Sequence, residues 1–273
     1  MITRIFSPGS EWLYLKIYCG VKTADIILQE TIIHLVSQLK KKNLVKKWFF
    51  IRYNDPKPHI RLRFQLSDIQ DYGKILEISN SDLKVFVDSG EIANILIDSY
   101  VRELERYGIE TIETAEDFFN KSSELVMGFL NYDDEDKIIV SMFYIEQMFS
   151  ELKLPITEKH DWVRESNNSF KREFNADKRL NNQLNKKFMK FETKYHAFFD
   201  SDEFEETRNL IIENISETKS ALKKIREYHS NFLLSFFSDI FHMHINRTFI
   251  SNQRLFEMIV YDYLLRHNKI LSE

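Results

Sequence analysis

Two arginines at alternate positions of a predicted strand are the residues of this chain most suited to chemistry. The segment HIRLRF places Arg61 and Arg63 on one face, because successive side chains of a strand point to opposite sides of the sheet. Planar guanidinium groups bind carboxylates and phosphates through paired hydrogen bonds. The spacing therefore predicts a cationic row that binds an anion, with the solvated face of a half-buried sheet as the alternative interpretation.

Two other groups of polar residues accompany this row. Arg52 lies on the preceding predicted strand, and His59 begins the arginine strand. Further along, the segment YVRELERYG ends a predicted strand with Arg106 and Tyr107. The ordinary explanation of a cation in that place is a surface ion pair, which contributes little free energy. At the level of the residues, both interpretations of this strand end stay open.

The third polar group, FHMHINR, directly follows an apolar stretch with helical character. Polar side chains in such a place need hydrogen-bond partners or line a cleft. On a helix His242 and Asn246 share a face, as do Met243 and Arg247, whereas His242 and His244 point in different directions. The two histidines are therefore poorly placed as metal ligands, and no third ligand is evident. A buried, hydrogen-bonded histidine is the alternative.

Composition narrows the classes of function. The chain has 273 residues, with 38 lysines and arginines against 42 aspartates and glutamates, so we do not expect a general nucleic-acid-binding protein. Its one cysteine, Cys19, allows no intramolecular disulfide and continues a buried apolar face. No secretory signal and no run of about 20 apolar residues is present, so a cytoplasmic location is expected.

Hydrophobic periodicity predicts an α+β fold. Residues 1–110 are expected to form a mainly antiparallel sheet with helices, packed against a helical region over 111–273, all in a single domain 1–273. In the first part, strands are predicted at 11–20, 48–53 and 59–66, helices at 25–42 and 68–79, and two strands around Asp88-Ser89-Gly90 within 83–108.

The second part is predicted to be helical throughout. Helices are expected at 114–131, 134–152, 231–246 and 251–269, with two or three more between 158 and 229. The acidic run Asp133–Asp136 suits the start of a helix, where negative charge is favourable, better than it suits a metal site.

Taken in order, the segments WLYLKIYCG, WFFIRYNDPKPHIRLRF, ELERYG and HMHINR resemble the small domain of lantibiotic dehydratases. That family includes free-standing thiopeptide-type bacteriocin biosynthesis proteins, and the resemblance extends from Glu11 to about Leu265. In these dehydratases the large domain transfers glutamate from glutamyl-tRNA to Ser and Thr of a precursor peptide. The small domain then eliminates the glutamate, which leaves dehydroalanine or dehydrobutyrine. This chain resembles a stand-alone elimination subunit of a split dehydratase.

The resemblance also implies roles for individual residues. The catalytic positions are Arg61 and Arg63 of the HxRxR strand, Arg106 of the ERYG motif and His242 of the HMxxNR motif. Arginines are poor bases at neutral pH, so they are expected to hold carboxylates and developing negative charge. His242 is expected either to protonate the leaving glutamate or to relay the Cα proton. Such chemistry requires no metal and no other cofactor.

The polar residues around these positions are expected to bind substrate, namely Arg52, His59, Tyr107, Asn246 and Arg247. Two departures from the family pattern stand out. Ile109 replaces a second glycine after ERYG, and Ser122-Ser123 stands where relatives commonly carry an acidic residue in a DS pair.

Two other functions are alternatives to elimination. One is a pyridine-forming cycloaddition enzyme of thiopeptide pathways, which resembles the same domain. The other is a non-catalytic subunit that binds a precursor peptide, for which an exposed sheet edge could accept an added strand. The expected partners are the glutamylated precursor peptide and a separate glutamylating subunit that uses tRNA. A homodimer is also possible, whereas neither direct contact with nucleic acid nor a membrane span is expected.

Overall fold

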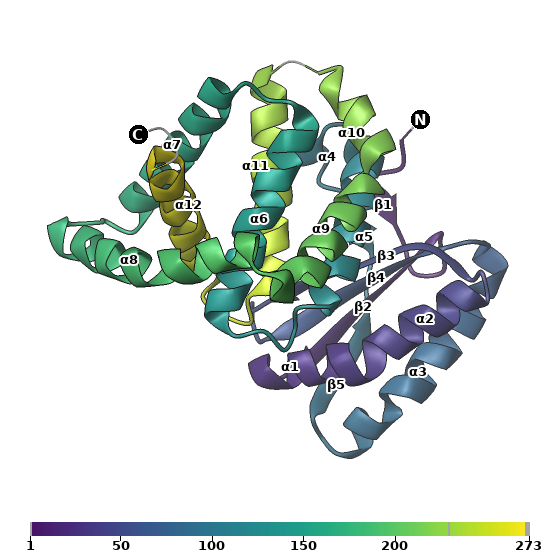
Figure 1. Cartoon of the computed structure of the whole chain (residues 1–273). Coiled ribbons are helices and arrows are strands. Elements are labelled where there is room, and N and C mark those ends of the chain that lie inside the picture. The colour runs from purple at the N-terminus through teal and green to yellow at the C-terminus, as the bar shows by residue number, and fades with distance from the viewer. Residues whose placement is uncertain (1, 229, 271–273) are drawn as a thin grey trace. The chain divides into compact units, whose positions relative to one another are not determined.

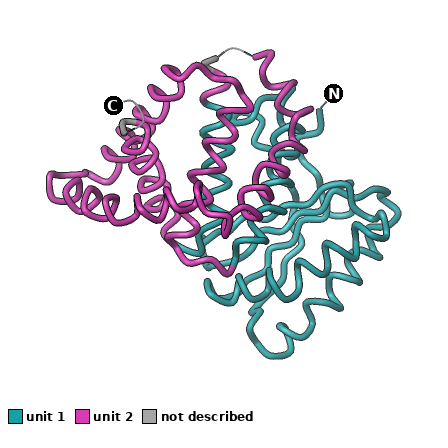
Figure 2. The backbone as a smooth tube through the Cα atoms, in the orientation of Figure 1, with its two compact units in different colours: residues 1–130, 235–251 teal, residues 131–234, 252–273 magenta. Residues whose placement is uncertain are grey.

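The computed structural model describes residues 2–228 and 230–270, and the chain divides into two units. Unit 1 comprises residues 1–130 and 235–251, and unit 2 comprises residues 131–234 and 252–273 (Figure 2). Among the described residues all strands lie between Ile5 and Val101, interspersed with helices, and they pair antiparallel, whereas the rest of the chain is helical. The predicted α+β class is therefore confirmed.

Unit 1 is built on a four-stranded sheet whose strand order is β3-β4-β2-β5. The strands are β2 (Trp12–Cys19), β3 (Val45–Tyr53), β4 (His59–Leu66) and β5 (Ile92–Ile97), and every neighbouring pair is antiparallel. The predicted strands at 11–20, 48–53 and 59–66 are confirmed. The turn between β3 and β4 contains a cis peptide bond before Pro56.

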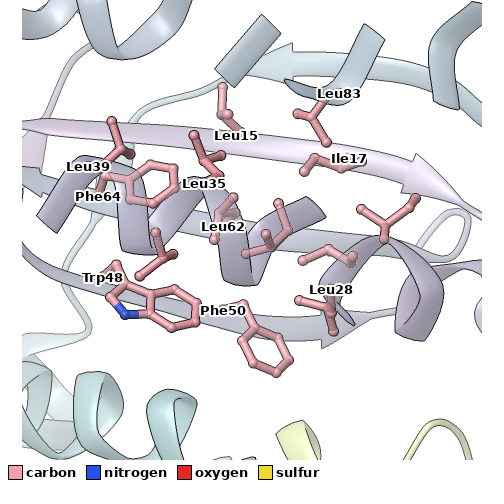
Figure 3. Close-up of a cluster of buried hydrophobic side chains, with 14 of the residues drawn as sticks. Leu15, Ile17, Leu28, Leu35, Leu39, Trp48, Phe50, Leu62, Phe64 and Leu83 are labelled. Atoms are coloured by element: carbon pink, nitrogen blue, oxygen red, sulfur yellow. The ribbon is translucent and has the colours of Figure 1, made fainter. Parts of the chain in front are cut away.

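One face of this sheet forms the apolar core of unit 1. It is covered by α1 (Val21–Ile27), a π-helical turn η1 (Leu28–Ile32), α2 (Ile33–Lys41) and α3 (Tyr72–Asp88) (Figure 1). Figure 3 shows leucines of the first helical segment, Leu28, Leu35 and Leu39, gathered with Leu62, Phe64 and Trp48 of the strands. Cys19 is buried in the same cluster, as predicted.

The region 83–88, predicted to be a strand, is the last part of α3. Its apolar residues alternate, which is typical of a strand, but the helix that begins at Tyr72 continues through them. Leu83 and Phe86 lie on the buried stripe of that helix, while Val85 and Val87 are exposed. The prediction was wrong because burial follows helical spacing here, and only β5 of the expected strand pair exists.

The ERYG segment also differs from its prediction as a strand end. Residues 104–107 form a single helical turn, α4 (Leu104–Tyr107), and Gly108 ends it with a φ of +78°. This left-handed conformation favours glycine, which accounts for the residue at that place. Just before the turn, β6 (Tyr100–Val101) pairs with β1 (Ile5–Phe6) in a separate two-stranded sheet.

Two long helices complete unit 1 at the open edge of β3. They are α5 (Ile112–Met127) and the greater part of α11 (Ser230–Thr248), close to the predicted helices at 114–131 and 231–246. Their side chains accept hydrogen bonds from alternate backbone N–H groups of the strand. Trp48 donates to Asn120 at 2.9 Å, Phe50 to Ser123 at 3.2 Å, and Arg52 to Asn246 at 3.0 Å. The edge of β3 is therefore capped by helices rather than by another strand.

Unit 2 is helical throughout its described residues. It contains α6 (Asp134–Leu152), α7 (Ile156–Glu173), α8 (Lys178–Asp200), α9 (Glu205–Ser216), α10 (Lys219–Arg226) and α12 (Gln253–Ile270). Short 3₁₀ turns lie at Ile69–Asp71 in unit 1 and Asp202–Phe204 in unit 2.

The helix starts and stops of unit 2 partly follow the predictions. Asp133 caps α6 by accepting a hydrogen bond from the Asp136 N–H, which confirms the acidic run as a helix start. Between 158 and 229 the described residues form four helices instead of two or three, because breaks occur at Asn175, where φ is +48°, at Ser201 and after Ser216. Across residues 2–228 and 230–270, no helix has the length and apolar character needed to cross a membrane.

Candidate active site

The sheet face opposite the core carries the arginine row, and strand pairing determines its neighbours. On the central strand β4, Arg63 pairs with Phe49 of β3 and Tyr14 of β2, Arg61 with Ile51 and Lys16, and His59 with Tyr53 and Tyr18. Because paired residues of neighbouring strands lie on the same face, these three rows form one surface of cations and aromatic rings. The two arginines predicted from spacing are held on rigid strands in this surface.

Arg63 is a buried cation among aromatic rings, with only 8% of its surface exposed. Its guanidinium carbon lies 4.2 Å from the centre of the Tyr14 ring and 5.0 Å from that of Tyr100. Within the described parts of the chain it forms no ion pair, and its Nε has no hydrogen-bond partner. Burial lowers the pKa of Arg63, while the neighbouring tyrosines oppose that shift. A buried arginine without a carboxylate is suited to receive an anion from outside.

A small pocket of about 40 Å³ adjoins Arg63. Residues that line it include Tyr100, Glu103, Tyr107, Met243 and Arg247. Its volume is comparable to the space of one water molecule, so the pocket is too small for a larger group without rearrangement of its lining. Arg63, Tyr107 and Arg247 are thus the predicted site residues that share this pocket.

Arg61 lies in the next row and is partly exposed. Its guanidinium carbon lies 3.4 Å from the centre of the Tyr53 ring, and its Nε donates to His59 Nε2 at 3.2 Å. The other nitrogen of His59 donates to the Lys57 carbonyl at 2.8 Å, which leaves Nε2 as the acceptor. Burial lowers the pKa of His59 and favours this neutral form. His59 therefore orients Arg61.

Arg106 is held between two carboxylates instead of lining the pocket. Its Nη2 lies 2.7 Å from Asp239 on α11, and its Nη1 lies 3.4 Å from Glu103. Burial alone lowers the pKa of Arg106, but the hydrogen bond and charge of Asp239 outweigh it and raise that pKa. Through this pair α4 is joined to α11.

His242 lies on α11 and is partly exposed. It follows Asp239 by three residues and precedes Asn246 by four, so helical spacing places all three on one stripe. Asp239 binds Arg106, and Asn246 binds both backbone groups of Arg52 at 3.0 Å. His242 is thus fixed between two anchored positions, next to Met243 of the pocket.

Arg52 and Arg247 fasten α11 to β3. Arg247 Nε donates to the Phe50 carbonyl at 2.8 Å, and Arg52 Nε donates to the Arg247 carbonyl at 3.0 Å. Arg52 also forms an ion pair with Asp25 and is buried. Burial lowers the pKa of Arg52, and Asp25 acts in the opposite direction. Arg52, Asn246 and Arg247 therefore hold α11 against β3, and Arg247 also lines the pocket.

The serine pair that departs from the family pattern is buried and hydrogen-bonded. Ser122 Oγ lies 2.9 Å from His244 Nδ1, and Ser123 Oγ donates to the Phe119 carbonyl at 2.8 Å. Burial, reinforced by the charge of Arg247, lowers the pKa of His244 to about 3. His244 is therefore a neutral core histidine that joins α11 to α5.

Residue spacing did not identify three neighbours of the arginine row. Tyr14 and Lys16 come from β2, and Asp98, which follows β5, forms an ion pair with Lys16. Burial raises the pKa of Tyr14, while Arg63, Arg61 and Lys16 lower it. Alternation along 11–20 puts Tyr14 and Lys16 on a common face, but only the strand register brings them beside the arginines.

Comparison with known proteins assigns the chain to a described family. The family model for the C-terminal part of lantibiotic biosynthesis dehydratases matches residues 12–268. The nisin biosynthesis protein NisB of Lactococcus lactis subsp. lactis is 30% identical over 95% of this chain and 25% of its own length. The subtilin biosynthesis protein SpaB of Bacillus subtilis is 26% identical over 97% of this chain and 26% of its own length. The chain therefore spans about a quarter of these curated relatives.

Two solved structures share the fold. The tRNA-dependent lantibiotic dehydratase MibB from Microbispora sp. 107891 aligns with a TM-score of 0.72 and 16% identity, over 97% of this chain and 29% of that protein. The pyridine synthase TbtD from thiomuracin biosynthesis aligns with a TM-score of 0.51 and 10% identity, over 96% of this chain and 100% of that protein.

Proposed function

Because the chain belongs to the lantibiotic biosynthesis dehydratase C-terminal family, we propose that it is a carbon–oxygen lyase of lanthipeptide-type biosynthesis. It eliminates glutamate from glutamylated Ser and Thr of a precursor peptide. The observation that carries this proposal is Arg63, a buried guanidinium without a carboxylate partner in the described chain. Its partners are the glutamylated peptide and a separate glutamylating protein, in the cytoplasm where peptide and glutamyl-tRNA are made.

The reaction is a β-elimination. A base removes the Cα proton of the glutamylated residue, and the electron pair of that C–H bond becomes the new Cα–Cβ π bond. The Cβ–O bond breaks, and its electron pair leaves with the oxygen as a carboxylate of free glutamate. No net oxidation occurs. The peptide ends one water molecule lighter than it was before glutamylation.

The arginine row stabilises the negative charge that develops in this reaction. Arg63 provides a cation in a dry, aromatic environment, where it interacts strongly with an enolate or a departing carboxylate. Arg61 lies one row further out, oriented by His59 and Tyr53. Arg106 is tied to Asp239 and Glu103, so its first effect is to position α11 and the pocket wall.

His242 supplies the proton transfer. Unlike the buried His244, it is partly exposed, so it is open to solvent and substrate. Histidine changes charge near neutral pH and serves as either acid or base. The anchors at Asp239 and Asn246 keep the helix stripe around His242 in place.

Mass spectrometry of a synthetic peptide with one glutamyl-serine ester tests the proposal. Elimination produces the unmodified mass less one water, whereas simple ester hydrolysis restores the unmodified mass. Arg63→Ala and His242→Ala are each expected to slow elimination by at least about a hundredfold, the range for loss of charge stabilisation or acid–base catalysis.

Arg254→Ala is the matched control. It removes an arginine that pairs with Glu173 and Glu257 in unit 2, and it should retain the wild-type rate. Hydrolysis without elimination by the wild-type protein would rule out the proposed lyase, and equal elimination rates in the wild-type and Arg63→Ala proteins would rule out the role of Arg63.

A further inference from the structure

A Lys–Asp pair adjoins the arginine row at the β5 side of the sheet. Lys16 on β2 is paired in register with Arg61 on β4 and with Leu96 on β5. Asp98 follows β5, and its N–H donates to the Tyr14 carbonyl at 3.1 Å, which fixes its backbone to β2. The two side chains form an ion pair with each other. One cation and one anion are thus held beside the proposed catalytic arginines.

Tyr14 connects this pair to the buried Arg63. The Arg63 guanidinium carbon lies 4.2 Å from the centre of the Tyr14 ring, and Lys16 Nζ lies 5.7 Å from the same centre. Burial raises the pKa of this tyrosine, and the charges of Arg63, Arg61 and Lys16 act against that rise. Lys16 and Arg63 are therefore near neighbours of the same tyrosine ring.

Both members of the pair are accessible and charged. The Lys16 side chain is 20% exposed and that of Asp98 is 44% exposed. The hydrogen bond from Lys16 lowers the pKa of Asp98, and the Ser99 N–H, at 2.7 Å, supports the carboxylate as well. A partly exposed ion pair adds little to stability. Lys16 is therefore available to a negative group of a ligand, and Asp98 to a positive group of the same ligand.

We propose that Lys16 and Asp98 recognise the glutamyl group as a zwitterion. A glutamyl residue esterified through its α-carboxyl retains an α-ammonium and a side-chain carboxylate. Lys16 Nζ binds that carboxylate, and Asp98 binds the ammonium, so that four alternating charges replace the two of the free protein. The ester then points toward Arg61 and Arg63. This inference rests on the proposed elimination and names the feature that selects glutamate among acyl groups.

Substrates that lack one charge test each half of the subsite. The peptide carries serine esterified with glutamate, with glutamine, which lacks the anion, or with N-acetylglutamate, which lacks the cation. Wild-type protein should prefer the glutamyl ester over each analogue by about tenfold to a hundredfold in kcat/KM, the effect of one charge-assisted hydrogen bond. Lys16→Met should abolish the preference over glutamine alone, and Asp98→Asn the preference over N-acetylglutamate alone.

Lys47→Met is the matched control, since Lys47 is 22% exposed and pairs with Asp117 in the same unit. It should retain both preferences, and Lys16→Arg should retain most of them because it keeps the charge. Wild-type rates that do not distinguish the three esters, or a Lys16→Met protein that retains the glutamate preference, overturn the subsite.

A binding measurement separates this inference from the lyase itself. In a peptide with 2,3-diaminopropionate in place of serine, the glutamyl group is held by an amide that does not eliminate. Calorimetry should show that wild-type protein binds this peptide about tenfold more tightly than its glutaminyl counterpart, and that Lys16→Met removes the difference. Such binding without elimination of the ester would retain the subsite and exclude the lyase, whereas equal binding of the two peptides would exclude the subsite.

Discussion

Arg63 places a positive charge among aromatic rings, and no carboxylate of the described residues forms an ion pair with it. A buried charge of this kind costs free energy in the free protein, and an apolar residue of similar volume is often more stable there. We therefore expect Arg63→Met to raise the free energy of unfolding by about 1–2 kcal/mol while elimination is lost. Urea denaturation, with the rate measured on the same sample, checks both effects.

Arg102 is the internal comparison for this experiment. It is equally buried, but it makes two hydrogen bonds of 2.7 Å to Glu116, which is fully buried as well. Arg102→Met leaves the Glu116 carboxylate buried without its cationic partner, and it should lower the free energy of unfolding by about 3–5 kcal/mol. Equal destabilisation by both substitutions would show that Arg63 is a structural residue like Arg102.

The buried His244 makes stability depend on pH. Its pKa is lowered to about 3 by burial and by Arg247, whereas an unfolded histidine titrates near 6.5. Between those values the unfolded chain binds the additional proton, so the free energy of unfolding falls as the pH falls below about 6.5. The expected loss from this residue is about 2 kcal/mol between about pH 7 and pH 5.

Denaturation of His244→Gln at both pH values measures that contribution. The glutamine variant should show a pH dependence that is weaker by the same amount. A parallel decline in the two proteins would assign the loss to other groups, of which His59, also with a lowered pKa, is the first to examine.

At the scale of elements, the capped edge of β3 determines how the site is assembled. Asn246 both accepts from the Arg52 N–H and donates to the Arg52 carbonyl, each at 3.0 Å. Asn246→Ala leaves two backbone groups without these partners, and we expect the free energy of unfolding to fall by about 2–4 kcal/mol. Asn185→Ala, which loses an exposed contact to Arg266, should stay within about 0.5 kcal/mol of the wild type in the same urea titration.

Sequence periodicity was sufficient for the elements with strong, unambiguous patterns. Alternation identified β2, β3 and β4, and the apolar run before FHMHINR identified α11. It failed at 83–88, where alternating valines occupy the exposed side of a helix. A short apolar stretch fits either period, and only the residues packed against it decide between them.

The site residues likewise fall into those that sequence spacing identifies and those that only the structure brings together. Arg61 and Arg63 could be singled out because both lie on one strand, where spacing alone fixes a shared face. Lys16 and Asp98 could not, because their place beside Arg61 depends on the register between strands. Likewise, sequence grouped Arg52, Asn246 and Arg247 as candidates, but only the structure shows that they hydrogen-bond backbone groups.

At the scale of the whole molecule, the proposed elimination is the second of the two reactions that dehydrate a precursor peptide. We expect the 273-residue protein to act on glutamyl esters and not to form them. It should leave an unmodified precursor peptide unchanged in the presence of glutamyl-tRNA, and dehydrate it once a glutamylating protein is added. Mass spectrometry after each addition checks this order, and dehydration without the second protein would contradict it.

The two units also interrupt each other along the chain. Along the chain, unit 1 is interrupted after residue 130 and continues at residue 235, once residues 131–234 of unit 2 have been passed. The stripe that carries His242 therefore belongs to the sheet unit although most of the helical unit precedes it. Residues that are distant in sequence meet in one site because α11 returns to β3.

Because the chain is made from its N-terminus, β3 is translated well before α11, which packs against its edge. Arg52 and its cap, Asn246, are separated by 194 residues, which a ribosome adding about 5–20 residues per second needs about 10–40 s to make. During that interval the end of β3 has emerged, but its last cap has not yet been translated. A stalled or truncated nascent chain would expose this strand edge to other polypeptides, so faithful completion of translation protects the protein from mispairing.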